Sequence, residues 1–302
     1  MVLVSHLMAE REYRGQWSVP ALREIVDFGW PLLFNVILFV LISQGDRFLV
    51  GSLYGMSSLA LYSVSTMLVM TTGASLHKIL QSVILPPLAR AQHDNAVFLR
   101  RHIASSRIFA ATTALYGSGM IILGEPLIVA LYGADYHTAG AWAAWLAAGQ
   151  AVRLLRIGPS LTALAKGDTR TFMYANCWRL IGVGLAGAAA ILHLPLAAIA
   201  VASLLGELVA LAHPVVRLAR RHGIAAPTCA RCFLAALATI CIAGLLVSVG
   251  ARGVLVWGGA VVGIGITLGV GIWMAVAYVS FCQTLGHAMQ LIDSPSRQEA
   301  AS

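Results

Sequence analysis

Charged residues are scarce in this sequence. Asp, Glu, Lys and Arg make up 11% of the 302 residues, whereas 59% are hydrophobic, which is far from the polar balance of soluble domains. The connections between the apolar stretches are mostly short, so a soluble domain of the usual ~100 residues has no room to fold. This composition argues against catalysis in water and indicates a membrane protein.

Several patterns of secreted and catalytic proteins are missing as well. The first twenty residues lack the apolar core of a signal peptide, so we expect the chain to begin in the cytosol as an arm over residues 1–24. No DxD, HxxxxD or Walker pattern is present, which argues against a membrane glycosyl- or acyltransferase. Of the five cysteines, only Cys229 and Cys232 form a CxxC, and a single pair is weak evidence for zinc. We expect a protein that is not an enzyme, with no metal and no cofactor.

Apolar stretches long enough to cross a bilayer, ~20 residues each, recur along the whole chain. They predict an all-α, polytopic membrane helix bundle with about eight transmembrane helices. The expected spans are 25–45, 60–84, 104–124, 138–161, 172–192, 195–216, 231–249 and 254–280. Residues 25–222 would form a six-helix unit, and residues 223–302 would add two helices and a short cytosolic tail.

Lysine and arginine gather in the N-terminal arm and in every second connection, and such residues are retained on the cytoplasmic side. The opposite side carries only Arg47 and Arg252. The basic residues of the arm and of the second, fourth and sixth connections are Arg11, Arg14, Arg23, Arg90, Arg100, Arg101, Lys166, Arg170, Arg217, Arg220, Arg221 and Arg231. We expect a multi-pass protein with both termini in the cytoplasm. The net charge of +8 is then mostly a topology signal, and nucleic acid is not an expected partner.

Proline and glycine punctuate the expected spans. Pro31 stands at the start of the first span, and Pro86 and Pro87 stand at the end of the second, where a missing N–H is least damaging. Within the fifth span, GVGLAG at 182–187 matches a dinucleotide-binding pattern in its letters, but no strand precedes it. Small residues at this spacing instead let transmembrane helices approach closely.

Five charged residues lie where they cannot avoid the bilayer. They are Lys78, Arg153, Arg156, Arg179 and Glu207. A charge at mid-membrane costs ~2.5–3.5 kcal/mol on insertion scales, so a chain that carries several has a use or a partner for them.

Helical spacing places these charges on polar stripes, one on each of four helices. The stripes are Thr71, Ser75, Lys78 and Ser82; Gln150, Arg153, Arg156 and Ser160; Asn176 and Arg179; and Ser203 and Glu207. Because the other faces of these helices are apolar, we expect the stripes to turn toward a common water-filled cavity. Its basic residues outnumber the acid, and arginine binds phosphate in bidentate geometry. We therefore expect Lys78, Arg153, Arg156 and Arg179 to bind a phosphate or pyrophosphate group.

Two other interpretations of these charges stay open. Lysine and arginine side chains can reach the membrane interface from within a span, and Lys78 is placed to do so. Glu207 is either a buried counter-ion to one arginine or a residue that couples protons or sodium to a conformational change.

Four stretches in a fixed order carry a resemblance. In FGWPLLFNVILFVLISQGDRFLVGSLYGMSSLALYSVSTML, residues 28–68, an early proline is followed by Asp46 and Arg47 at the far end of the span, a glycine-containing turn and Leu-x-x-Tyr-Ser. The others are LPPLARAQHD (85–94), ALYGADYHTAGAWAAWLA (130–147) and LTALAKGDTRTFMYAN (161–176). Over about residues 20–222 the chain resembles the polysaccharide flippases of the multidrug/oligosaccharidyl-lipid/polysaccharide exporter superfamily.

The resemblance implies a flippase of the bacterial inner membrane. Its substrate would be an O-antigen or exopolysaccharide repeat unit on undecaprenyl diphosphate, moved by alternating access between two six-helix lobes. Asp46 and Arg47 would lie near the periplasmic end of their helix and close a gate or fix the turn, or form a solvated cap; Asn35 shares the face of Asp46. These families have no strict cationic motif, so the four basic residues above are predicted from charge and periodicity alone.

The chain departs from these families in one respect. Their members usually have twelve to fourteen helices, whereas this sequence resembles their second lobe plus two further spans. The expected partners are therefore the lipid bilayer, a lipid-linked oligosaccharide, and a first-lobe chain or a second copy that completes the cavity. Two alternatives are a non-transporting component of a polysaccharide assembly complex and a drug or cation antiporter of the same superfamily. The antiporter is disfavoured because Glu207 is the only central carboxylate.

Overall fold

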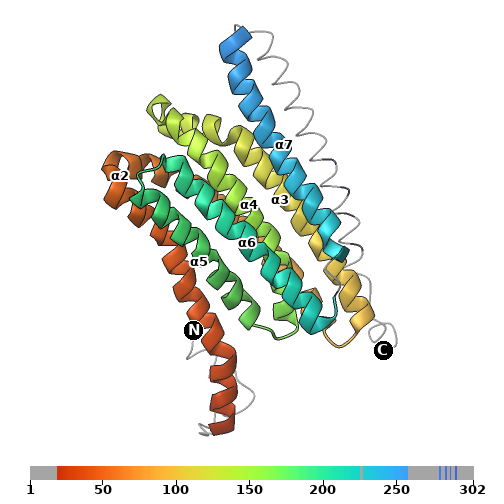
Figure 1. Cartoon of the computed structure of the whole chain (residues 1–302). Helices are drawn as coiled ribbons and strands as arrows, with labels where there is room; N and C mark the ends of the chain where they lie inside the picture. The colour runs from red at the N-terminus through yellow and green to blue at the C-terminus, as the bar shows by residue number, and fades with distance from the viewer. Residues whose placement is uncertain are drawn as a thin grey trace, which may run out of the picture.

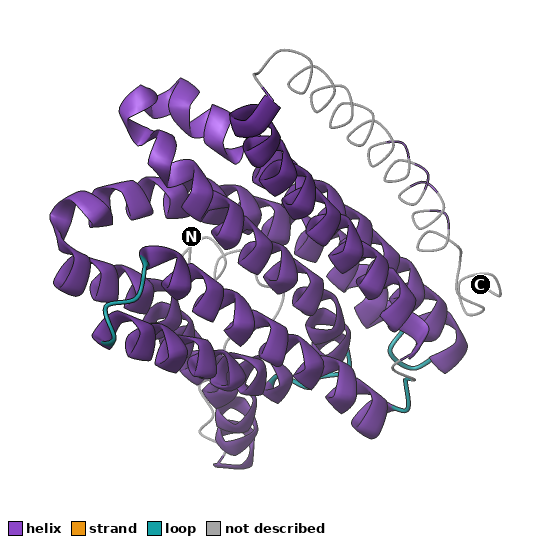
Figure 2. Cartoon of the chain, turned by 45° about the horizontal axis from the view of Figure 1, so that its top comes forward, coloured by secondary structure: helices purple, strands orange, loops and turns teal. Residues whose placement is uncertain are grey.

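The computed structural model describes residues 19–224 and 227–257, together with residues 279, 283, 286 and 290. Within these residues every regular element is a helix (Figures 1 and 2), which confirms the expected all-α class. The elements are α2 (Val19–Arg90), α3 (Asn95–Tyr132), the short 3₁₀ helix η1 (Ala134–Tyr136), α4 (His137–Ala165), α5 (Arg170–Ile191), α6 (Leu196–His222) and α7 (Pro227–Trp257).

Helix α2 is two helices that meet at Gly55. The backbone there has φ 84° and ψ 171°, a conformation that glycine adopts without the strain of a side chain. The apolar part of α2, Ile25–Arg90, has 66 residues and would measure about 100 Å as one straight helix, far more than a bilayer core of ~30 Å. The bend at Gly55 therefore divides α2 into two helical segments, which correspond to the first two expected spans. With α3, α4, α5 and α6, residues 19–222 contain six long helical segments.

The odd-numbered connections meet at one end of the bundle. Tyr54, beside the bend of α2, donates a hydrogen bond to the carbonyl of Leu194 between α5 and α6. Tyr54 and Tyr136, which precedes α4, also pack against the same apolar cluster. The first, third and fifth connections are therefore neighbours in the fold.

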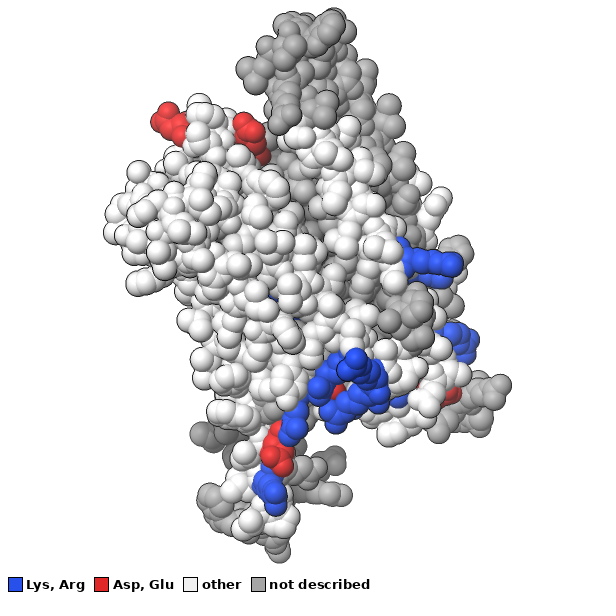
Figure 3. Space-filling view, in the orientation of Figure 1, with Lys and Arg blue, Asp and Glu red and all other residues white. Residues whose placement is uncertain are grey.

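The basic connections meet at the opposite end. Lys166, just after α4, donates to the carbonyl of Gln92 between α2 and α3, 2.7 Å away. Asp168, before α5, pairs with Arg217 near the end of α6, 2.9 Å away. Lys and Arg side chains gather at this lower end of the molecule in Figure 3. The alternation of connections that the charge pattern predicts is thus present in the fold.

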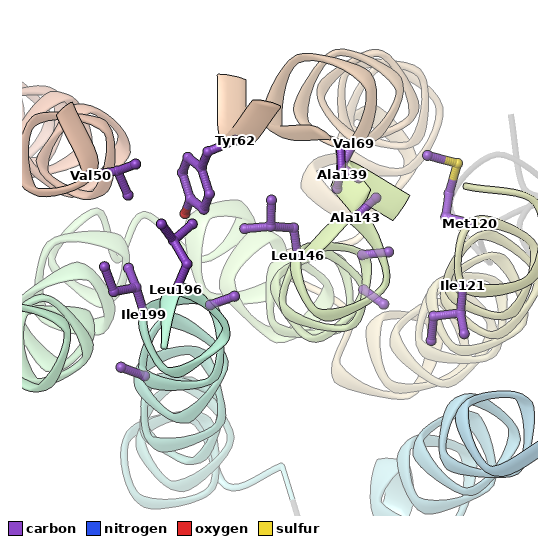
Figure 4. Packing of buried hydrophobic residues seen from close by; sticks show 14 of the residues in the cluster. Val50, Tyr62, Val69, Met120, Ile121, Ala139, Ala143, Leu146, Leu196 and Ile199 are labelled. Carbon is purple, nitrogen blue, oxygen red and sulfur yellow. The ribbon is translucent and has the colours of Figure 1, made fainter. Parts of the chain in front are cut away.

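Apolar clusters fill the bundle along its length, and the two largest lie toward its opposite ends. The cluster nearer the odd connections includes Val50, Tyr62 and Leu146, whose side chains point between the helices in Figure 4. The cluster nearer the basic end includes Phe98 and Phe109 of α3. Large side chains buried in this way contribute ~1.5–3 kcal/mol each relative to exposure in water.

Several expected boundaries differ from the structure. Pro31 and Pro86 lie inside α2, because proline keeps a helical φ even though it removes an N–H donor. The helix continues to Arg90, and Arg101 of α3 donates to the carbonyl of Pro87. Helix α7 runs on to Trp257, past the expected end of the seventh span at 249.

Among the described residues, four helical segments are long and apolar enough to cross a membrane by themselves: Ile25–Arg90, Asn95–Tyr132, Leu196–His222 and Ala230–Ser248. Helices α4 and α5 have 29 and 22 residues, which suffices in length, and they carry the embedded arginines. The remainder of the expected eighth span at 254–280, the tail, and most of the arm lie outside the described residues.

Candidate functional site

Glu207 of α6 gathers three arginines from two neighbouring helices. Its Oε1 lies 2.8 Å from Nε of Arg153 on α4 and 2.6 Å from Nη2 of Arg179 on α5. Its Oε2 lies 3.6 Å from Nε of Arg156, also on α4. None of the four residues is more than 9% exposed. Glu207 is thus a shared counter-ion to three arginines, a larger role than the single pairing considered from the sequence.

The local sequence explains how these side chains meet. Arg153 and Arg156 are three residues apart on α4 and so share one face of that helix. Helices α5 and α6 touch through Gly182 and Gly206, where a Cβ built on Gly206 would lie 2.7 Å from the Cα of Gly182. Glu207 follows Gly206 directly, and Arg179 stands three residues before Gly182. The expected close helix approach within 182–187 is therefore confirmed, and it is made by Gly182.

A second acid reduces the excess of positive charge within the cluster. One carboxylate cannot neutralise three guanidinium groups, and an unpaired buried charge is costly. Asp46 of α2 interacts electrostatically with Arg153 and Arg179 and with the side chain of Ser203. Three cationic groups and two carboxyl groups therefore connect α2, α4, α5 and α6.

A chain of amides extends the cluster toward the first half of α2. Arg179 donates from Nη1 to Oδ1 of Asn176, 2.9 Å away, and Asn176 donates in turn to Oδ1 of Asn35. Asn35 and Asp46 are both on α2, so this helix reaches the arginines at two levels.

The cluster is closed in this conformation. A cavity beside Arg153 and Glu207, lined also by Gln150 and Ser203, has a volume of about 10 Å³. That volume holds about one water molecule and is too small for a phosphate group. Arg153 also contacts the sulfur of Met70, 3.3 Å away, so α2 covers this side of the cluster.

Lys78 lies apart from the arginines. It is exposed on the second half of α2, as are Thr71, Ser75 and Ser82 of the same stripe. The Ser75 hydroxyl donates to the carbonyl of Thr71 in its own helix, and Ser82, two turns on, donates to the carbonyl of Ile79. The structure therefore brings together three of the four basic residues predicted to bind phosphate, and leaves Lys78 on the surface of the described bundle.

Asp46 and Arg47 share one neighbour but differ in their other contacts. Both interact electrostatically with Tyr62, which is 1% exposed and lies after the bend of α2. Asp46 additionally reaches the arginine cluster, whereas Nε of Arg47 is buried without a hydrogen-bond partner in the described part of the chain. The two residues thus connect the turn at Gly55 with the buried charges.

A second ionic cluster at the basic end was not identified from the sequence. Arg217 donates to both carboxylate oxygens of Asp168, at 2.9 and 3.2 Å, and Arg221 and His222 lie 3.5 and 3.8 Å from Oδ2. Burial raises the pKa of the Asp168 carboxyl, but the hydrogen bond and charge of Arg217 and the charge of Arg221 outweigh it, so this pKa lies below its usual range. The only sequence signal was an acid in a basic connection.

Among the described residues, no group of three or more His, Cys, Asp or Glu side chains is arranged to hold a metal ion. The side chain of Cys229 is outside this description, and Cys232 is a free thiol. The described residues therefore offer no candidate metal centre.

Comparison with known proteins finds a similarity to one family over the first part of the chain. Residues 1–140 match the family model described as "Polysaccharide biosynthesis protein". This match supports a polysaccharide flippase-type family. It confirms the resemblance drawn from the sequence and covers Asp46, Arg47 and Lys78, while the arginine cluster lies beyond it. No curated protein and no solved structure matches the chain.

Proposed function

We propose that this protein is a flippase that moves undecaprenyl-diphosphate-linked oligosaccharide across the bacterial inner membrane for polysaccharide or O-antigen biosynthesis. The family match supports a role in polysaccharide biosynthesis, and the long apolar helices support a membrane location. The activity in this proposal is transport and involves no chemical step.

The exposed stripe around Lys78 is the observation that carries the proposal. Much of the surface of the second half of α2 is apolar; Met67 and Ile79, for example, are each 59% exposed. The stripe of Thr71, Ser75 and Lys78 interrupts this surface, and lysine facing hydrocarbon costs several kcal/mol, ~2.5–3.5 on insertion scales. A water-filled path along this face of α2 removes that cost and offers an anionic substrate a first cation.

The arginine cluster supplies the second part of the proposed path. Arg153, Arg156 and Arg179 are held by Glu207, and a diphosphate group offers the same guanidinium groups bidentate acceptors. In this proposal the diphosphate replaces Glu207 at these arginines as the bundle opens, so Glu207 couples substrate binding to the conformational change. Asp46 and Arg47, about two helical turns before the bend at Gly55, act as gating residues.

A partner completes the path in this proposal. The stripe on α2 needs a polar or aqueous surface opposite it, and an exposed lysine against lipid would destabilise the inserted state. A first-lobe chain or a second copy of this chain provides that surface.

One observation favours a different function. Glu207 and Asp46 hold the arginines of the cluster, and the cavity beside them has room for about one water molecule, as expected of a rigid structural core. A non-transporting membrane component of a polysaccharide assembly complex is therefore the second candidate. A drug or cation antiporter has no comparable support, because the buried arginines outnumber the acids.

Export in cells that lack their own flippase distinguishes the two candidates. Lys78→Gln should lower export of lipid-linked oligosaccharide several-fold at matched protein level. Arg107→Gln, which removes an exposed charge from α3, should leave export unchanged. Equal export by wild type and Lys78→Gln would show that Lys78 has no role in transport. That result would contradict the argument for a flippase and favour the structural component.

A further inference from the structure

A second polar site lies at the basic end of the bundle, apart from the arginine cluster. It is an open cavity of about 720 Å³ between the start of α2, the connection from α4 to α5, and the end of α6. This volume falls in the range of small-molecule sites, ~300–1,000 Å³. Its charged lining residues are Arg23, Asp27, Asp168, Arg170 and Arg221.

The side chains that line this cavity carry a net positive charge. Arg23, Arg170 and Arg221 face two carboxylates, but Asp168 is already engaged by Arg217 through two hydrogen bonds. Asp168 is 5% exposed, so its negative charge is largely neutralised by Arg217 and contributes little to the cavity. Arg23 and Arg170 are exposed, and together they exceed the single remaining acid, Asp27.

The connection that forms one wall of the cavity has a fixed shape. Gly167 has φ 79°, and the Asp168 N–H donates to the carbonyl of Ala163, 2.9 Å away, while the Gly167 N–H donates to Leu164. This is a Schellman motif, which ends α4 sharply. Helix α5 then starts at Arg170, so its N-terminus opens onto the cavity, where the helix dipole favours an anion.

Aromatic side chains indicate the depth of the cavity relative to a membrane. Tyr174 and Trp178, in the first turns of α5, are 37% and 47% exposed, and the guanidinium of Arg217 lies over the Tyr174 ring, 5.0 Å from its centroid. Exposed tyrosine and tryptophan are typical of the headgroup level. Arg170, which lines the cavity, stands about one turn before Tyr174 and about two turns before Trp178, so the cavity lies next to the level that these rings indicate for lipid headgroups.

We propose that this cavity binds the phosphate-bearing headgroup of a membrane lipid. Arg23 and Arg170 contact the phosphate oxygens, and Asp168 orients Arg221 beside them. A diphosphate presents more acceptors than a phosphodiester and suits more than one arginine. For the diphosphate-linked carrier this inference rests on the proposed function, as the place where the substrate first docks; phosphate is the chemistry it shares with phospholipids.

Binding to the purified full-length protein tests the proposal. The probes are inorganic pyrophosphate and a short-chain polyprenyl diphosphate, each titrated calorimetrically in neutral detergent, and nanodiscs with and without phosphatidylglycerol. The double variant Arg23→Gln/Arg170→Gln should weaken the affinity for the diphosphates at least tenfold, since each lost charge-assisted hydrogen bond weakens binding by about that factor. Arg220→Gln is the matched control, because Arg220 is exposed on the same end of α6 but does not line the cavity.

The two lipid sources give different supporting results. Weaker binding of both diphosphates assigns the cavity to the carrier lipid, whereas loss confined to phosphatidylglycerol assigns it to a phospholipid. Three results would overturn the proposal. The first is a wild type that binds neither the diphosphates nor phosphatidylglycerol detectably, the second is a double variant that keeps the wild-type affinities, and the third is a loss of affinity in Arg220→Gln as large as that in the double variant. Because Lys78→Gln tests export separately, unchanged binding here together with lost export there would refute the docking site and leave the proposed function standing.

Discussion

The guanidinium of Arg179 lies 2.6 Å from the carboxylate of Glu207, across the contact between α5 and α6. Gly182 and Gly206 make that contact possible, because their backbones meet with no side chain between them. Close packing and charge pairing therefore depend on each other at this point. Since Arg153 and Arg156 share the same carboxylate, one acid holds three helices together.

Loss of the Glu207 charge should destabilise the bundle strongly. Glu207→Gln leaves three buried arginines with Asp46 as their remaining carboxyl group, and breaking a buried ion pair costs ~3–5 kcal/mol. Thermal unfolding of the purified protein in detergent measures the effect. Glu125→Gln, which changes an exposed glutamate in α3, should leave the midpoint unchanged; similar midpoints for both variants would contradict the shared role of Glu207.

Two glycine-to-alanine changes should have opposite signs. A Cβ at position 206 meets the backbone of Gly182 at 2.7 Å, so Gly206→Ala should push α5 from α6 and destabilise by ~1–3 kcal/mol, as overpacked sites do. Gly184 has open space around it, so Gly184→Ala should be neutral or stabilise by ~0.5–1 kcal/mol through helix propensity. Equal unfolding midpoints for the two variants would show that the close approach is not required.

The pairing of Asp168 predicts a dependence of stability on pH. Its pKa is held below the ordinary value, so its contribution is complete above the unfolded pKa of ~3.9 and is lost as the pH falls through the folded pKa. The gap in unfolding midpoint between wild type and Asp168→Asn should therefore be constant near neutral pH and close below about pH 4. Asp135→Asn, in the exposed 3₁₀ helix, serves as the control. A gap that persists unchanged at low pH would mean that charge pairing is not its source.

The charge pattern predicts which end of the bundle faces the cytoplasm. Reporter fusions after Arg101, Lys166 and Arg221 should report the cytoplasm. Fusions after Tyr54, Ala134 and His193 should report the periplasm, because these residues lie at the opposite end of the fold. A single inverted fusion would contradict the predicted orientation.

Periodicity identified some of the buried polar residues. The spacing of Arg153 and Arg156 on α4, and of Asn176 and Arg179 on α5, correctly indicated that each pair shares a face. It left open what each face meets, because that depends on contacts between helices far apart in the sequence. Lys78 follows the same helical rule as the arginines and nevertheless lies on the described surface.

Other features depended on contacts that a single sequence does not encode locally. Asp168 and Arg217 are 49 residues apart, and their pairing follows from the sharp turn at Gly167 and the length of α6. The positions of Pro31 and Pro86 inside α2 were not predicted, because a helical φ at proline is allowed wherever the lost hydrogen bond can be replaced or left to solvent. A turn in this region was predicted from the sequence. That two helices meet directly at Gly55, with no loop between them, was not.

Translocation of lipid-linked oligosaccharide tests the central claim most directly. The measurement is the appearance of the oligosaccharide on the periplasmic face of cells that lack their own flippase. This chain is expressed alone in one culture and with a first-lobe fragment in another. We predict translocation when the exposed stripe around Lys78 has its partner, which is either the co-expressed fragment or a second copy of the chain. The double variant Arg153→Ala/Arg156→Ala should lose translocation at matched protein level. No translocation in either culture, with the protein inserted and folded, would contradict the proposed function.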